Sequence, residues 1–258
     1  MKPASIAYPL LLVLLVTALP SCAGFGSRRA KVTPQRPRIG FTTQTTEFGT
    51  FEVEGGIQTD PSDNFSVPLR GKLGVSPTAE LLVDLAPYAY EDVPGPDPSG
   101  PSPLTVVFRQ RLMNESKAFP ATSFHLGARL PVGEDDFGSG FNDFITGFSA
   151  DRTFNNVLAT AFYQLGLLGT DERGNLDVEH TASLAMTLPL TERVFGLAEL
   201  GAQYNVEQSD GPLVLNLAGI YDFTDTLVLD AGIRFGLNDD AEDFALQLGF
   251  TTNLGILF

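Results

Sequence analysis

The amino-acid sequence predicts an all-β protein, a transmembrane antiparallel up-and-down β-barrel of twelve strands. Three observations support this fold class: an export leader, a series of alternating apolar and polar segments from about Thr50 onward, and connections that alternate between short and long. Outer-membrane barrels cross the bilayer with strands of this alternation, joined by short periplasmic turns and longer outer loops. We therefore divide the chain into a signal peptide (residues 1–23), a tether (24–46) and the barrel (47–258).

Residues 1–23 form the predicted secretory signal peptide. Lys2 precedes an apolar run from Pro9 to Leu19 that ends at small residues. This run is too short for a mature membrane-spanning helix, which needs about 20 apolar residues. Two processing routes stay open, because Ser21-Cys22-Ala23 suits an ordinary signal peptidase, whereas Leu19-Pro20-Ser21-Cys22 resembles a lipobox that would lipidate Cys22.

The composition excludes several classes of function. Cys22 is the only cysteine, so the mature body has no disulfide and no thiolate metal site. No second apolar run of about 18 residues follows the leader, so any membrane span consists of strands. A net charge of −15 argues against a nucleic-acid partner, because polyanions are repelled where no basic patch attracts them. We expect no cofactor and no bound metal.

Residues 24–46 connect the leader to the barrel. Basic residues lie among Ser, Thr and Pro in this stretch, and no apolar periodicity is present. Segments of this kind bury too little apolar surface to offset the entropy of ordering. We therefore expect a disordered periplasmic tether.

Segments of 8 to 14 residues then alternate apolar with polar or small side chains, bounded by Gly, Pro, Asp, Asn or Ser. This alternation is typical of strands with two different faces. No segment with a helical period interrupts the series. The twelve predicted strands are 50–58, 64–75, 79–90, 104–112, 123–130, 141–150, 155–168, 177–188, 193–204, 212–223, 227–235 and 244–252.

The connections between these strands alternate in length. Tight ones are expected at 76–78, 151–154, 191–192 and 224–226. The longer ones, at 59–63, 91–103, 131–140, 169–176, 205–211 and 236–243, hold sixteen Asp or Glu and a single Arg. An even strand number places both termini in the periplasm and the acidic loops at the cell surface, next to lipopolysaccharide. The longer connection 113–122 is the exception on the periplasmic side.

Each strand has an apolar and a polar face. In the last strand Leu246 and Leu248 are two residues apart, as a face toward lipid requires. A charge at the bilayer midplane costs roughly 2–4 kcal/mol, so Asp230 and Arg234 point into the lumen. The same register gives these lumen-lining candidates: Glu52, Glu54, Arg70, Lys72, Asp84, Arg109, Arg111, His125, Arg129, Glu179, Glu199, Asp230 and Arg234.

Two interpretations of the lumen charges stay open. A basic sector from Arg70 to Arg129 facing an acidic sector from Glu179 to Asp230 would give a water-filled pore with a transverse field. Alternatively, the charges form cross-strand pairs that make the wall rigid.

A soluble lipocalin-like barrel would show the same alternation with its faces exchanged. The leader and the loop rhythm favour the membrane barrel. Phe258, in phase with the last strand, favours it too, because a terminal aromatic residue is the usual signal read by the barrel-assembly machinery.

Two stretches carry a family resemblance. Residues 219–237, GIYDFTDTLVLDAGIRFGL, and residues 129–133, RLPVG, are similar to the transporter-like outer-membrane family named for the MetA pathway of phenol degradation. The resemblance spans about Glu47 to Thr252. It implies an outer-membrane barrel linked to uptake or efflux of small aromatic or hydrophobic compounds, and it supplies no binding residue.

Three functions follow as hypotheses. The first is a channel or transporter-like barrel for small solutes. The second is a structural or surface-interaction barrel with a plugged lumen, whose acidic loops, such as 134–136 and 239–243, bind cations or remain simply solvated. The third is a lipid hydrolase that uses His180, the histidine predicted to face lipid. We predict that the chain is not an enzyme, since a structural role suits an interfacial histidine.

Overall fold

The computed structural model describes residues 32–92, 97–132, 137, 139–170, 175–207 and 211–258. The predicted signal peptide, the lipidation candidate Cys22 and the first part of the predicted tether lie outside these residues. None of the described residues forms a helix that is long and apolar enough to cross a membrane.

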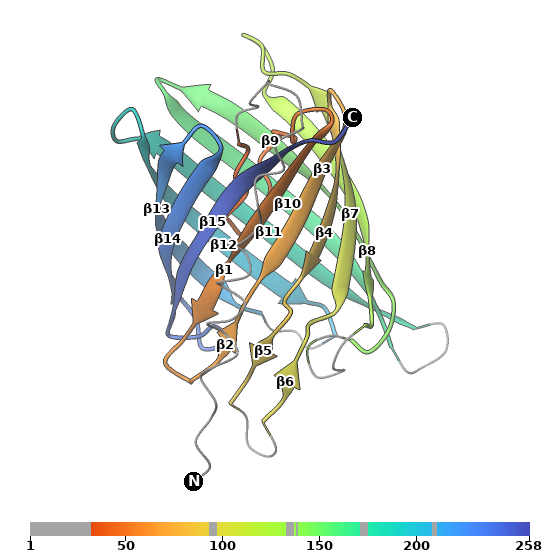
Figure 1. The fold of residues 1–258 in the computed structure, drawn as a ribbon. Helices are drawn as coiled ribbons and strands as arrows, with labels where there is room; N and C mark the ends of the chain where they lie inside the picture. The colour runs from red at the N-terminus through yellow and green to blue at the C-terminus, as the bar shows by residue number, and fades with distance from the viewer. Residues whose placement is uncertain (1–31, 93–96, 133–136, 138, 171–174, 208–210) are drawn as a thin grey trace.

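Among the described residues, twelve long strands form a closed antiparallel barrel (Figure 1). The first strand pairs with the last, from Thr50 opposite Ile256 to Thr59 opposite Leu246. The predicted fold class is therefore confirmed. The strands are β1 (Thr50–Thr59), β3 (Leu69–Ser76), β4 (Ala79–Leu85), β7 (Leu104–Met113), β8 (Ala121–Leu130), β9 (Asp143–Phe154), β10 (Val157–Gly169), β11 (Leu176–Pro189), β12 (Val194–Asn205), β13 (Leu213–Thr224), β14 (Leu227–Gly236) and β15 (Phe244–Ile256).

Three short strands extend the sheet beyond the barrel wall: β2 (Phe65–Ser66), β5 (Ala89–Tyr90) and β6 (Ser99–Gly100). The sequence predicted single strands at 64–75 and 79–90, whereas each is interrupted at a proline, Pro68 and Pro87. Proline has no amide hydrogen and cannot complete the ladder of hydrogen bonds. These extensions lie at the end of the barrel with the long connections, which we call the loop end (Figure 1).

The opposite end carries the short connections and the C-terminus, and we call it the turn end (Figure 1). The predicted turn at 151–154 is wrong, because β9 continues to Phe154. The chain reverses at Asn155 and Asn156, with φ angles of 46° and 72°. Asparagine tolerates this left-handed region, which a two-residue hairpin turn requires.

The strand faces follow the predicted alternation. Leu246 and Leu248 on β15 are 47% and 54% exposed on the outside, whereas Ala245 and Gln247 are 1% and 6% exposed toward the lumen. Exposed Phe, Leu and Tyr side chains recur on the outer surface of the other strands. A surface of this kind suits a lipid environment.

The lumen is occupied by residues 32–48, which we call the luminal segment and which appears as a red-orange trace inside the barrel (Figure 1). Val32, Gln35, Phe41 and Thr46 are all buried. The expectation of a disordered tether is therefore wrong for residues 32–46. The wall carboxylates that bind amides of this segment lie 19 or more residues away in sequence, so local composition gave no indication of them.

Candidate functional site

The luminal segment forms a loop whose two ends, Val32 and Phe48, both lie near the turn end of the barrel. Val32 packs in an apolar cluster with Leu197 and Val228, which lie near the turn end of their strands. At the tip of the loop, Ile39 lies against Gly201. The segment then returns, and Phe48 forms a parallel bridge with Gly74 shortly before β1 begins.

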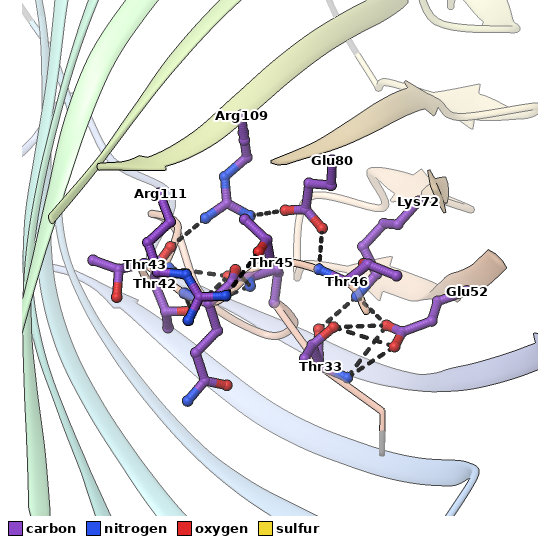
Figure 2. A network of polar contacts seen from close by, with 12 residues as sticks. Thr33, Thr42, Thr43, Thr45, Thr46, Glu52, Lys72, Glu80, Arg109 and Arg111 are labelled. Carbon is purple, nitrogen blue, oxygen red and sulfur yellow. Dashed lines mark hydrogen bonds and ion pairs between the residues drawn. The ribbon is translucent and has the colours of Figure 1, made fainter. Parts of the chain in front are cut away.

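Five carboxylates on the wall, which we call the luminal acceptors, bind main-chain amides of this loop. The acceptors are Glu52, Glu54, Glu80, Asp151 and Glu199. Glu52 accepts from the Thr33 amide at 3.2 Å, Glu54 from Gln35 at 2.7 Å, Asp151 from Thr43 at 2.7 Å and Glu80 from Thr46 at 2.7 Å; Glu199 accepts from Ile39 at 2.8 Å and Gly40 at 3.1 Å. Figure 2 shows Thr33 beside Glu52 and Thr46 beside Glu80.

Wall donors bind carbonyl groups of the same loop. Lys72 Nζ donates to the Thr33 carbonyl at 2.5 Å, and Asn216 Nδ2 donates to the Pro37 carbonyl at 2.7 Å. Arg109 donates to the Thr42 carbonyl (Figure 2). Donors and acceptors of the wall therefore satisfy both kinds of main-chain group, as burial of a polar backbone requires.

Charged side chains of the wall also pair directly across neighbouring strands. Lys72 lies 2.8 Å from both Glu52 and Glu54. Arg70 pairs with Asp84 at 2.6 Å. The remaining pairs are Arg109 with Glu80 and, at 3.2 Å, Arg129 with Asp143. Of the two interpretations of the lumen charges, the contacts support cross-strand pairing.

Phe41 is the aromatic anchor of the luminal segment. Its ring packs edge-on against His125 at 5.4 Å and Phe162 at 5.8 Å between centroids. The guanidinium groups of Arg70 and Arg109 lie 5.0 Å and 4.5 Å from its centroid, within the range of a cation–π interaction.

The other predicted lumen residues also lie on the inner face. Arg111 donates to the Thr45 hydroxyl at 3.2 Å, Glu179 accepts from Gln203 at 2.6 Å, and Arg234 donates to Gln58 at 3.0 Å. Asp230 faces Arg36 at 3.7 Å. His125 bonds Gln164 at 3.1 Å. Every predicted lumen residue thus contacts either the wall or the luminal segment.

Sequence reasoning missed Glu80, Asp143 and Asp151, together with the luminal segment itself. The missed carboxylates lie at or beside the ends that were predicted for their strands, where the face is hard to assign. One feature of the sequence could have indicated a segment inside the lumen, namely glycines at positions that face the lumen. A side chain at Gly56, Gly201 or Gly249 would overlap Arg36 or Ile39 of the segment, so these glycines leave room for it.

At the loop end, a cavity of about 180 Å³ lies above Ile39 and is lined by Arg234, Asp240 and Glu242. Burial raises the pKa of Glu242, and the neighbouring Asp60 carboxylate raises it further. Two neighbouring carboxyl groups therefore lie at the mouth of the barrel at the loop end, close to the Arg234 guanidinium, which acts in the opposite direction on the pKa of Glu242.

On the outer face, His180 hydrogen bonds the Tyr163 hydroxyl at 2.7 Å. Within the described ranges, no three or more His, Cys, Asp or Glu side chains gather in a way that could hold a metal ion.

Comparisons with known proteins bear on the fold. No protein-family model matches the chain, and no curated protein matches it. The NanC porin matches with a TM-score of 0.56 at 8% identity, covering 78% of this chain and 98% of that one. The fold is that of a porin-like barrel.

Two structures of the KdgM porin are similar as well. The one in complex with disordered oligogalacturonate gives a TM-score of 0.55 at 9% identity, covering 79% of this chain and 98% of that porin. The other gives 0.54 at 5% identity, with 78% and 98% covered. At such identities the porin-like fold is what is shared. The resemblance to the phenol-degradation family stays an expectation.

Proposed function

We propose that this chain is an outer-membrane, porin-like channel for small solutes whose lumen is closed by its own N-terminal segment. The observation that carries this proposal is that the wall is a complete barrel without the luminal segment. The twelve strands close on themselves through β1 and β15, and the luminal segment adds no strand to the wall. Its departure would therefore leave every strand pair intact.

The lumen that would remain is suited to water and solutes. Ion pairs such as Arg70 with Asp84 and Arg129 with Asp143 join wall residues to each other and do not need the segment. Paired charges of both signs give a polar lining, as in water-filled barrels. In the plugged state Asp143 is buried and Arg70, Asp84 and Arg129 are half-buried; in the open state all four would be hydrated.

For the solute, we propose small aromatic or hydrophobic compounds. The site around Phe41 supports this class, because Phe162, His125 and two guanidinium groups already surround an aromatic ring there. The family resemblance of residues 219–237 points the same way. An acidic saccharide is the competing class, since a KdgM structure of similar fold was obtained with oligogalacturonate.

Conductance in planar bilayers tests the channel. The double variant Gly40→Leu, Phe41→Ala should release the segment, because a side chain at position 40 would overlap Phe162 and the aromatic anchor is lost. We expect discrete current steps in this variant and near silence in the wild type. Gln44→Leu, Phe48→Ala is the matched control, since both of its side chains are exposed. In the open variant, benzoate should reduce the current more than acetate or galacturonate.

Release of the segment is measured independently, as trypsin cleavage after Arg38. A double variant that is cleaved yet shows no current would reject the channel and favour the structural barrel with a plugged lumen. The lipid hydrolase is the least supported function, because His180 is bonded to a tyrosine on the outer face. We expect His180→Ala to leave any lipid-directed activity unchanged.

A further inference from the structure

The wall binds main-chain amides and carbonyl groups of the luminal segment, in addition to several of its side chains. Amides of Thr33, Gln35, Thr43 and Thr46 each donate to a wall carboxylate. Main-chain groups are the same in every non-proline residue, so contacts of this kind do not depend on which side chains are present.

The spacing of two acceptors matches an extended chain. Glu52 and Glu54 are two residues apart on β1, and they accept from Thr33 and Gln35, which are also two apart. Alternate side chains of a strand share one face and are separated by one two-residue repeat. The same repeat separates alternate amides of an extended peptide. The spacing of these two wall carboxylates therefore matches the spacing of alternate amides in an extended polypeptide, a repeat that a small solute lacks.

Side-chain contacts differ among these four positions. The Thr33 and Thr43 hydroxyls donate to the same carboxylates as their amides, Glu52 at 3.0 Å and Asp151 at 2.8 Å, whereas Thr46 and Gln35 contact the wall carboxylates through their amides. The Thr46 hydroxyl is buried and has no hydrogen-bond partner among the described residues, although the Thr46 amide donates to Glu80 at 2.7 Å. Gln35 directs its side chain back to Thr42 of its own loop, while its amide donates to Glu54. At Gln35 and Thr46 the wall therefore binds the main-chain amide, whereas the Gln35 side chain forms its hydrogen bond within the segment.

We propose that the lumen is a binding site for a polypeptide main chain, occupied here by the protein's own segment and able to take a free peptide when that segment is displaced. The covalent link gives the segment a high effective concentration, so a free peptide competes poorly with the wild-type segment. The proposal does not rest on conduction, because a plugged structural barrel would show the same binding.

The first test removes amide hydrogens from the luminal segment and leaves the residues of the wall unchanged. In the full chain, Thr33→Pro, Thr43→Pro, Thr46→Pro removes three donors. Thr33→Val, Thr43→Val, Thr46→Val removes only the hydroxyls. Charge-assisted hydrogen bonds are strong, so we expect trypsin to cleave after Arg38 at least about tenfold faster in the proline variant. The valine variant should stay within about threefold of the wild type.

Gln44→Pro controls for the rigidity of proline, since the Gln44 amide donates to Thr42 within the loop rather than to the wall. This variant should remain protected. Equal cleavage of the valine and proline variants would overturn main-chain recognition, and so would cleavage of Gln44→Pro at the rate of the triple proline variant.

The second test supplies the peptide separately. A fluorescent synthetic peptide of residues 32–48 is titrated onto the refolded triple proline variant, and its anisotropy is measured. We expect saturable binding, together with a loss of at least about tenfold in affinity when the four amides at Thr33, Gln35, Thr43 and Thr46 are N-methylated. Equal binding of both peptides, or no binding of either, would reject the proposal whether or not the barrel conducts.

Discussion

Phe41 shows how one side chain can fix a segment that has few apolar residues. It is 8% exposed and belongs to an apolar cluster with Leu82, Val107, Ile145 and Phe162. Phe48, at the end of the same segment, is 48% exposed. Comparing substitutions of these two phenylalanines therefore measures how much the burial of Phe41 contributes to keeping the segment inside the barrel.

We predict that Phe41→Ala loosens the segment and that Phe48→Ala does not. Truncating a buried phenylalanine costs roughly 3–5 kcal/mol, which would raise trypsin cleavage after Arg38 strongly. Phe41→Leu should lie between Phe41→Ala and the wild type, because it keeps much of the apolar volume. Protection of Phe41→Ala equal to that of the wild type would show that the amide contacts alone hold the loop.

Lys72 is the second residue with a large expected effect. Its ammonium group is fully buried, 2.8 Å from both Glu52 and Glu54. Removing one member of a buried ion cluster typically costs 3–5 kcal/mol, because the remaining charges lose their partner.

We therefore expect Lys72→Met to lower the urea midpoint of unfolding, followed by the gel mobility of the folded barrel. The triple change Glu52→Gln, Lys72→Met, Glu54→Gln should recover much of this loss, since no unpaired charge remains. Lys117→Met, at an exposed position, is the control. A triple variant less stable than Lys72→Met would contradict the pairing argument.

At the scale of elements, period-two alternation predicted the strands well, because the outer surface and the lumen of this barrel have opposite polarity. The interruptions of the strands at Pro68 and Pro87 could have been predicted from the sequence, since proline lacks an amide hydrogen. The turn at Asn155 was missed because Asp151 and Arg152 resemble turn residues, whereas Asp151 bonds Thr43 inside the lumen.

The luminal segment could not be predicted in the same way. Its partners, such as Glu199 on β12 and Asp151 on β9, are more than a hundred residues away in sequence. Composition describes only what a segment can bury by itself. A barrel lumen supplies acceptors that a free segment does not have, so a polar sequence becomes ordered without an apolar core.

The seam between β1 and β15 offers a test at this scale. Gly249 pairs with Gly56 across the seam, and Arg36 lies so close that a side chain at either position would overlap its guanidinium. We predict that Gly249→Leu displaces Arg36 and increases trypsin cleavage after Arg38. Gly219→Leu is the matched control on β13, because a side chain there would meet nothing within 4 Å. Equal protection of the two variants would show that the seam does not position the segment.

At the scale of the whole molecule, the two ends of the barrel differ. Both ends of the luminal segment lie near the turn end, and the loop end carries the long connections that the sequence indicated to be acidic. The close approach of Asp60 and Glu242 at the loop end disfavours the charged form of Glu242, because burial and the neighbouring carboxylate both raise the pKa of this group. This contact makes the stability of the mouth depend on pH.

The sign of this dependence follows from the direction of the shift. A carboxyl group whose pKa is higher in the folded state binds its proton more tightly when folded, so its contribution is favourable below the unfolded pKa and is lost as pH rises through the folded pKa. We therefore predict that Glu242→Gln raises the melting temperature of the refolded barrel at pH 7.5, where the wild-type group is more often charged. The difference should shrink at pH 4, where the wild-type carboxyl is mostly protonated and resembles the amide. Asp225→Asn, in an exposed connection at the turn end, is the control and should show no such pH-dependent gain. A gain from Glu242→Gln that is as large at pH 4 as at pH 7.5 would mean that the amide acts through packing, and that the carboxyl pair does not make the loop end of the barrel sensitive to pH.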